Sequence, residues 1–156
     1  MIGDVALVVV DIVIVVGVSI GMGAWAPRWP ASWLEHDTFP LHLWPWETVS
    51  FYRRLGVARL VHRLPELGST FGGASKDRLP GTSASDMAAY LLEVRRAEWV
   101  HWLSVASSLL LVAFNPWWLA LAFVVAVTAG NLPFIAVLRN NRLRIQRIID
   151  RDGRRT

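Results

Sequence analysis

The chain has 156 residues, of which 54% are hydrophobic and only 18% are charged, and its mean hydropathy is +0.39. This composition excludes a disordered chain and is too apolar for an ordinary soluble domain, so we expect one membrane-embedded domain over residues 1–156. The absence of cysteine excludes disulfide scaffolds, cysteine zinc sites, iron–sulfur clusters and thiol nucleophiles. The net charge of +4 indicates an anionic membrane surface or an anionic small molecule, because the apolar stripes between the arginines argue against nucleic acid.

A first membrane-spanning helix is predicted over residues 5–26, which are apolar except for Asp11 and Ser19. About 20 apolar residues cross the hydrocarbon core as a helix, and in lipid only a helix satisfies its own backbone groups. A cleaved signal peptide is the alternative, because residues 24–26 read Ala-Trp-Ala. We prefer an uncleaved helix, since no positive charge precedes the apolar run and Pro27 follows the pattern.

Residues 27–97 form a long interfacial segment. Its first part, 27–47, holds four tryptophans and four prolines, so it is chain lying in the interface rather than one helix. Residues 48–63 alternate apolar and arginine positions at helical spacing, which predicts a basic amphipathic surface helix. Residues 64–84 are turn-rich, and Ser85 is a candidate N-cap for the helix that follows.

The helix that begins near Ser85 is expected to enter the membrane as a second span over about 98–114. Residues 115–116, Asn-Pro, break it, and a third span covers 117–138. The tail, 139–156, holds seven arginines with aliphatic residues between them and predicts a second basic surface helix. The fold class is therefore an all-α membrane protein with three transmembrane helices plus basic amphipathic interfacial helices.

The distribution of basic residues predicts the orientation of the chain. Nine lie in 27–97 and seven after residue 138, whereas none precedes the first helix or lies in the 115–118 turn. Basic residues favour the cytoplasmic side, so we expect a multi-pass cell-membrane protein with the N-terminus outside and a cytoplasmic tail. Membrane lipids are the expected partners. Three spans make a small bundle, so a homo-oligomer is a further expectation.

The strongest local signal for chemistry is the segment around Glu98 and His101. The two residues are three apart and share a helix face at the expected membrane entry. A histidine oriented by a carboxylate is a general base that activates a hydroxyl, so we predict His101 and Glu98 as catalytic residues. Arg95 and Arg96 precede them and could bind phosphates, such as the diphosphate of coenzyme A. The alternative is a salt-bridge cluster at the helix end.

Three other patterns give weaker signals. Glu-x-x-His occurs only once, and the other histidines are scattered, so we predict no metal site. The glycine-rich segment 68–76 resembles a phosphate loop but fails the Walker pattern, and Lys76 within it either closes over an acyl donor or belongs to a simple turn. Asn131 lies two residues before Pro133, where it could bond to a backbone carbonyl or to a neighbouring helix. A structural role, in which its hydrogen bond holds helices together, is the favoured interpretation.

Four segments occur in an order that resembles a known family. They are RLPELGSTFGGASKDRLPG (63–81), VRRAEWVHW (94–102), FNPWW (114–118) and GNLPFIAVLRNNRLRIQRI (130–148). Together they resemble the glycosyl-4,4'-diaponeurosporenoate acyltransferases of staphyloxanthin-type carotenoid biosynthesis. Several ordered motifs are more specific than any one alone, and the resemblance covers about residues 60–149.

The resemblance implies an acyltransferase that moves a fatty acyl group to a sugar hydroxyl of a glycosylated carotenoid, terpenoid or related glycolipid. Acyl-CoA is the expected co-substrate, and no other cofactor is expected. The substrate-binding candidates, taken from the residues and the matching motifs together, are Glu93, Arg95, Arg96, Lys76, Asn131, Arg139, Asn141 and Arg142. Asn131 and Arg139 are the candidates for stabilising an oxyanion.

Two competing functions remain open from the sequence. One is a metal-dependent integral membrane enzyme that uses Glu98, His101 and a second histidine. The other is a non-enzymatic lipid-binding subunit whose arginine faces hold anionic lipid.

Overall fold

The computed structural model describes residues 2–61 and 84–153, and within these ranges the chain is helical with no strand. The all-α prediction is therefore confirmed for this part of the chain. The α-helices are α1 (Ile2–Trp25), α2 (Val49–Arg54), α3 (Val57–Val61), α4 (Ala84–Ser108) and α5 (Trp117–Asp152). Three 3₁₀ turns add Ala26–Arg28, Ala31–Trp33 and Leu109–Ala113.

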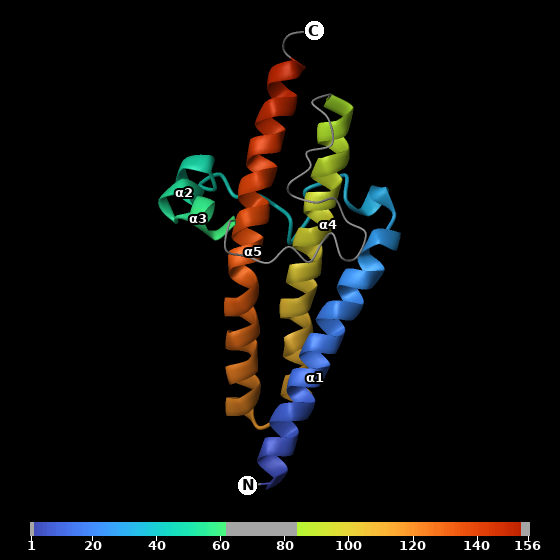
Figure 1. Cartoon of the computed structure of the whole chain (residues 1–156), viewed down its shortest axis with the longest axis vertical. Helices are drawn as coiled ribbons and strands as arrows, with labels where there is room; N and C mark the ends of the chain where they lie inside the picture. Colours follow the sequence, from blue (N-terminus) through green and yellow to red (C-terminus); the bar gives the residue numbers. More distant parts are fainter. Residues whose placement is uncertain (1, 62–83, 154–156) are drawn as a thin grey trace.

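Three long helices set the shape of the molecule (Figure 1). Helices α4 and α5 run antiparallel and pack along each other, and α1 crosses α4 obliquely. The short helices α2 and α3 lie beside the middle of α5, at one flank. The N-terminus lies at the same end as the turn between α4 and α5, and the C-terminus lies at the opposite end.

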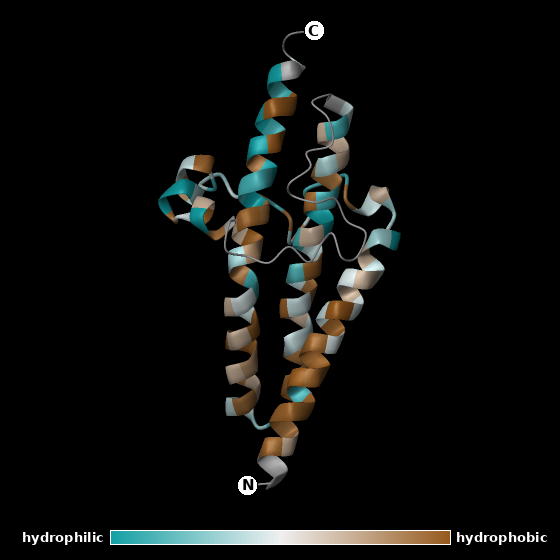
Figure 2. Ribbon diagram, viewed as in Figure 1, coloured by the Kyte–Doolittle hydropathy of each residue, from teal (hydrophilic) through white to brown (hydrophobic). Residues whose placement is uncertain are grey.

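Hydropathy divides the molecule along its long axis (Figure 2). The half that holds α1, the end of α4 and the start of α5 is apolar, and its large side chains point outward: Phe114 is 78% exposed and Trp117 is 76% exposed. Among the described residues, α1 and α5 are long and apolar enough to cross a membrane. Helix α4 does not qualify, because its first half is charged, so two of the three predicted spans are supported.

Helix α5 corrects the prediction for the basic tail. It continues unbroken for 36 residues, so residues 139–152 extend the predicted third span and form no separate surface helix. Pro133 lies inside α5 without ending it, and neither glycine nor proline follows until Gly153. No helix-breaking residue follows Leu138 before Gly153, so the helix continues. The change from apolar to basic side chains does not end it.

Up to residue 61, where the described part ends, the predicted surface helix over 48–63 is two short helices. Thr48 caps α2 by accepting a hydrogen bond from the Phe51 amide at 3.1 Å. Helix α2 ends at Arg54, and Gly56, with φ of +73°, turns the chain into α3. A left-handed backbone of this kind suits glycine. The conformation of this one residue therefore divides the predicted helix in two.

Two details of the long helices complete the comparison with the sequence. Helix α4 begins at Ala84, which places Ser85 inside its first turn rather than before it. The break at Asn115 and Pro116 is confirmed, and Asn115 has a further role: its Nδ2 donates to buried Asp11 Oδ1 at 3.1 Å and ties α1 to this turn. The partner of Asp11 is thus an amide.

The tryptophan- and proline-rich segment between α1 and α2, residues 26–48, is packed against the helices and is called the loop below. Leu34 and Leu41 are fully buried, although their neighbours Trp33, Trp44 and Trp46 are exposed. The segment contributes backbone carbonyls and two carboxylates to the interior of the polar half, as the next section describes. Interfacial tryptophans were expected there, but the buried anchors between them were not.

Candidate active site

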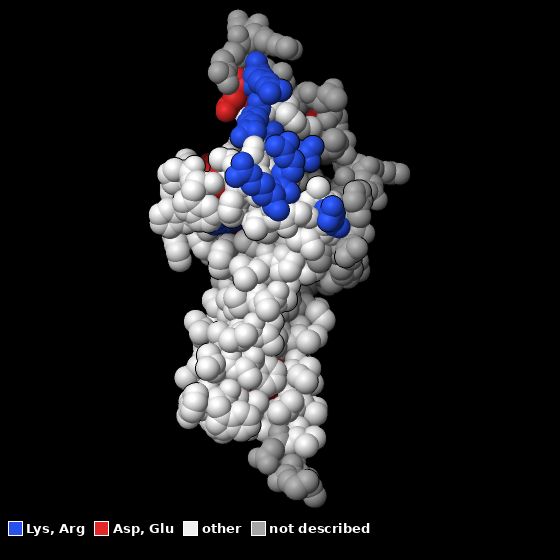
Figure 3. Space-filling view, turned by 90° about the vertical axis from the view of Figure 1, so that its left-hand side faces the viewer, with Lys and Arg blue, Asp and Glu red and all other residues white. Residues whose placement is uncertain are grey.

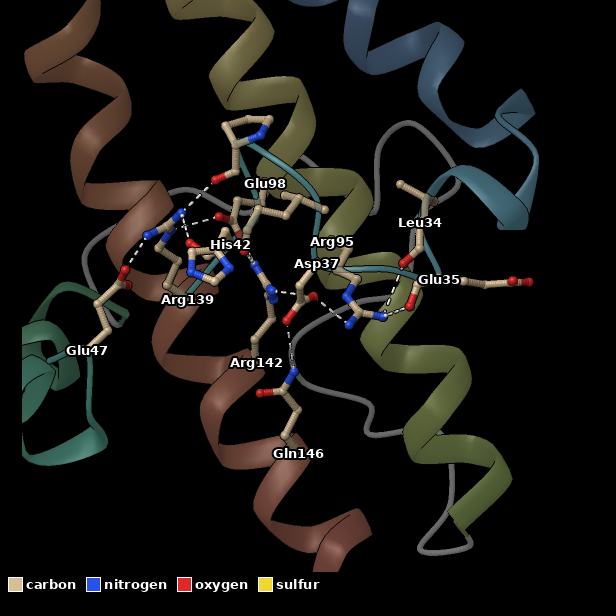
Figure 4. Close-up of polar contacts among 12 residues, drawn as sticks. Leu34, Glu35, Asp37, His42, Glu47, Arg95, Glu98, Arg139, Arg142 and Gln146 are labelled. Carbon is tan, nitrogen blue, oxygen red and sulfur yellow. Dashed lines mark hydrogen bonds and ion pairs between the residues drawn. The ribbon is translucent and has the colours of Figure 1, made fainter. Parts of the chain in front are cut away.

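A buried carboxylate, Glu98 on α4, joins α4 to α5 (Figure 4) near Arg139, the first basic residue of α5. Arg139 Nε donates to its Oε1 at 2.8 Å, and Arg142 Nη1 donates to its Oε2 at 2.6 Å. The indole Nε1 of Trp102 lies 3.4 Å from Oε1. Both oxygens of Glu98 are therefore held by the opposite helix.

A second buried carboxylate, Glu47, holds Arg139 from the other side. Arg139 Nη1 donates to Glu47 Oε1 at 2.5 Å, and the Trp44 amide donates to the same oxygen at 3.1 Å. Tyr52 Oη donates to Glu47 Oε2 at 2.5 Å. Burial, together with this hydrogen bond, raises the pKa of Tyr52, so its hydroxyl stays protonated and acts as a donor.

A third carboxylate, Asp37, is shared by two arginines. Arg95 Nη2 lies 2.6 Å and Arg142 Nη2 lies 2.7 Å from Asp37 Oδ1. Gln146 Nε2 donates to Oδ2 at 3.5 Å. Arg95 Nη1 also donates to the carbonyls of Leu34 and Glu35 at 3.1 and 3.0 Å (Figure 4), so the loop is bound to α4 through both backbone and side chain.

These contacts form one charge-balanced group, the ion cluster, of three arginines and three carboxylates: Asp37, Glu47, Arg95, Glu98, Arg139 and Arg142. Buried charges of this kind are tolerated because each has an opposite partner and further hydrogen bonds. Arg139 also donates to the carbonyls of Pro40 and His42, and Arg142 to that of Leu41. The cluster therefore fastens the loop onto the α4–α5 pair.

The ion cluster changes the interpretation of the predicted phosphate-binding arginines. Arg95 is buried and its guanidinium group contacts Asp37, so it does not present a free cation to a phosphate. The same holds for Arg142, which was predicted as a substrate-binding residue. Arg96 pairs with Glu93 one helical turn away. Glu98 does belong to a salt-bridge cluster, as the alternative held, but it lies inside α4 rather than at a helix end.

His101 has a different partner from the one predicted. Its Nδ1 lies 2.7 Å from Asn131 Oδ1 on α5, and its ring stacks on Phe134 at 4.9 Å between centroids. The prediction that Glu98 orients His101 is wrong, because both Glu98 oxygens are taken by arginines. Side chains three residues apart differ by about 60° around a helix, enough to direct them to different neighbours.

The hydrogen bonds of Asn131 determine the tautomer of His101. Asn131 Nδ2 donates to the Val127 carbonyl at 2.8 Å, which turns its Oδ1 toward the imidazole. An oxygen accepts only, so Nδ1 of a neutral His101 carries the proton and Nε2 keeps its lone pair. This arrangement suits a general base. Asn131 is already hydrogen-bonded to His101 and to the Val127 carbonyl, and Arg139 is already paired with two carboxylates. Neither side chain therefore matches the predicted oxyanion donor.

A cavity of about 490 Å³ opens beside the ion cluster. Its walls come from the loop, α4 and α5, and they are mainly aromatic: Asp37, Phe39, Pro40, His42, Trp44, Trp46, Trp102 and Arg139. Trp102 directly follows His101 on α4, so consecutive residues carry the cavity wall and the candidate base.

The remaining predicted residues are placed as follows. Asn141 is half-buried on α5, whereas Lys76 lies outside the described residues. Sequence reasoning missed Asp37, Glu47 and Tyr52; the signal available was that 27–47 contains only three acidic residues among its tryptophans and prolines. In the described part of the chain, no group of three or more histidine, aspartate or glutamate side chains could hold a metal ion.

Fold and site together define a small helical protein with a histidine–amide pair and an aromatic cavity at the edge of an apolar half. Comparison with known proteins makes this class specific. Residues 30–151 match the model of the glycosyl-4,4'-diaponeurosporenoate acyltransferase family, and the chain belongs to that family. The resemblance seen in the sequence is thereby confirmed.

One curated relative supports the same assignment. A protein of Staphylococcus haemolyticus (strain JCSC1435) named glycosyl-4,4'-diaponeurosporenoate acyltransferase is 29% identical over 123 residues, which cover 76% of this chain and 71% of the relative. No solved structure matches the chain. The chain is accordingly an acyltransferase, and this assignment is favoured over a metal-dependent enzyme or a non-enzymatic subunit.

Proposed function

We propose that this protein transfers a fatty acyl group to a sugar hydroxyl of a glycosylated carotenoid or related terpenoid glycolipid, with His101 as general base. The family supplies the reaction class. The observation that carries the assignment of the base is the Asn131–His101 contact of 2.7 Å, because it leaves Nε2 unprotonated.

In the proposed reaction His101 is the base. His101 Nε2 takes the proton of the acceptor hydroxyl as its oxygen attacks the carbonyl carbon of the acyl donor. With acyl-CoA as donor, the new ester C–O bond forms and the C–S bond breaks. The departing thiolate then takes the proton from the imidazolium, which restores neutral His101.

The dimensions of α5 support a placement in the membrane. From Trp117 to Arg139 the helix rises about 33 Å, which is close to the thickness of the hydrocarbon core, roughly 30 Å. We place the apolar half of Figure 2 in the bilayer and the polar half on the cytoplasmic side, where acyl-CoA is available. Trp44 and Trp46 then lie at one interface and Trp117 at the other.

An anionic donor would meet the exposed arginines rather than those of the ion cluster. Figure 3 shows basic side chains gathered on the polar half, whereas the apolar half of the same face carries almost none. Arg144, Arg147 and Arg151 on α5 are exposed, unlike Arg95 and Arg142. In this proposal Glu98 and the buried arginines hold the loop in place and do not touch the reacting atoms.

The test is mass spectrometry of lipid extracts from cells that produce glycosylated carotenoid and express one of three chains. Wild type and His36→Ala, an exposed histidine in the loop, are expected to add a fatty-acyl mass to the glycolipid. His101→Ala is expected to add none, while eluting in detergent as wild type does. A fully active His101→Ala protein refutes the assignment of the base, and an inactive wild type refutes the acceptor class.

A further inference from the structure

The cavity beside the ion cluster differs chemically from a site for an anionic donor. Among the described residues that line it, the only cation is Arg139. That guanidinium already donates to Glu47, Glu98 and two carbonyls, so its charge is compensated. The cavity also includes Asp37, whose carboxylate is already paired with Arg95 and Arg142, so no unpaired cation among the described residues faces the cavity. A phosphate-bearing ligand is therefore disfavoured.

The walls suit a ring that has both apolar and hydrogen-bonding faces. Trp44, Trp46 and Trp102 offer flat surfaces, on which the C–H face of a sugar ring packs. His42 and Asp37 offer polar atoms in the same cavity. A purely aliphatic or polyene chain would cover these polar groups and displace the water that they bind. It offers no hydrogen bonds in exchange, which is unfavourable.

The aromatic walls are held in position before any ligand arrives. Trp102 is restrained by its indole contact with Glu98 and by the Arg139 guanidinium, 5.8 Å from its ring centroid. Trp44 packs edge to face on His42 at 5.4 Å, and Trp46 packs in the same manner on Phe51 at 5.2 Å. Binding to such restrained side chains costs little conformational entropy.

Resting on the proposed function, we infer that this cavity binds the neutral sugar of the acceptor. Its volume of about 490 Å³ falls in the range of ligand sites, roughly 300–1,000 Å³. Its position at the edge of the apolar half lets a glycolipid keep its hydrocarbon part in the bilayer. Trp102, one of the cavity walls, directly follows His101 on α4, and the two side chains point about 100° apart around the helix.

Matched tryptophan variants test this inference. Trp46 lines the cavity and is 59% exposed, whereas Trp33 lies outside it and is 60% exposed. In the acylation assay with purified protein in nanodiscs, Trp46→Ala is expected to raise KM for the glycosylated acceptor about tenfold, equivalent to about 1.4 kcal/mol. KM for the acyl donor stays unchanged. Trp33→Ala leaves both values as in wild type.

A binding experiment separates this inference from the proposed function. Saturation-transfer difference NMR with the methyl glycosides of glucose, galactose and mannose is expected to show contact with wild type and Trp33→Ala, and a several-fold weaker signal with Trp46→Ala. Coenzyme A leaves the signal unchanged. Glycoside binding without acyl transfer supports the sugar site and overturns the reaction. Acyl transfer with equal acceptor KM in both variants, no glycoside signal, or displacement by coenzyme A overturns the sugar site.

Discussion

Replacing Glu98 by glutamine tests whether the ion cluster holds the fold together. Glu98 is fully buried between Arg139 and Arg142, with contacts of 2.8 and 2.6 Å. The substitution keeps the shape of the side chain but leaves a group of three arginines with two carboxylates. Breaking a buried ion pair by removing one partner costs about 3–5 kcal/mol. We expect Glu98→Gln to unfold at a temperature lower by on the order of 10 °C.

Glu93→Gln is the matched control on the same helix. Among the described residues Glu93 pairs with Arg96, and 34% of its side chain is exposed. Such a pair contributes about 0.3–0.5 kcal/mol, so this variant should unfold close to wild type. Thermal unfolding of the detergent-solubilised chain, followed by circular dichroism at 222 nm, compares the two.

The same variants distinguish a positioning role for Glu98 from a chemical one. If Glu98 acts only through the ion cluster, Glu98→Gln should retain acyl transfer at temperatures where it is still folded. An unfolding temperature equal to that of wild type, together with abolished transfer, would refute the reasoning, because Glu98 would then act in the reaction rather than in packing.

Two further predictions concern local backbone and pH. Gly56→Ala should destabilise the chain by about 1–2 kcal/mol, because φ is +73° there. Gly17→Ala should not destabilise it, because the space around Gly17 is open. Equal shifts of the unfolding temperature in the two variants would contradict this prediction. Because the pKa of Tyr52 is raised, folding should lose stability as pH rises above about 10, where the unfolded chain releases the phenolic proton and the folded chain retains it. Phenolate absorbance should therefore show one of the two tyrosines titrating only on unfolding, and Tyr52→Phe should remove this pH dependence; reversible titration of both near pH 10 with intact helices would oppose it.

The helices could be predicted where local chemistry determines them. An apolar run without breakers predicted α1, and Asn115 with Pro116 predicted the turn before α5. The interruption at Gly56 and the extension of α5 past Leu138 were missed. The first depends on one positive φ, and the second depends on the absence of a stop signal, which hydropathy does not report.

The candidate site was predicted in its residues but not in its pairing. Glu98, His101, Asn131, Arg139 and Arg142 were all singled out, because ionisable and amide groups next to apolar helices are unusual. Their partners lie on other elements, about 30 to 44 residues away along the chain. No local spacing encodes such contacts, so the helical period suggested the nearest pair rather than the one that forms.

The loop carboxylates were beyond prediction for a related reason. Glu47 and Asp37 lie in irregular chain, where no period indicates which side chains turn inward. Each approaches an arginine 58 to 105 residues further along the chain. Such contacts depend on how α4 and α5 pack, which brings Arg95 and Arg142 to the same carboxylate.

The lengths of α4 and α5 show why the ion cluster belongs at the boundary. From Glu98 to Ala113 the chain rises only about 25 Å, even with a final 3₁₀ stretch that gains about 2.0 Å per residue, whereas α5 rises about 33 Å from Trp117 to Arg139. The Glu98–Arg139 contact joins the two helices at one end, and the short turn joins them at the other. In the proposed placement, the charges of α4 thus meet the interface already paired, and the loop that they fasten holds Trp44 and Trp46 at headgroup depth. An acceptor with a sugar head and an apolar body is matched to that position, since it reaches the cavity without leaving the lipid.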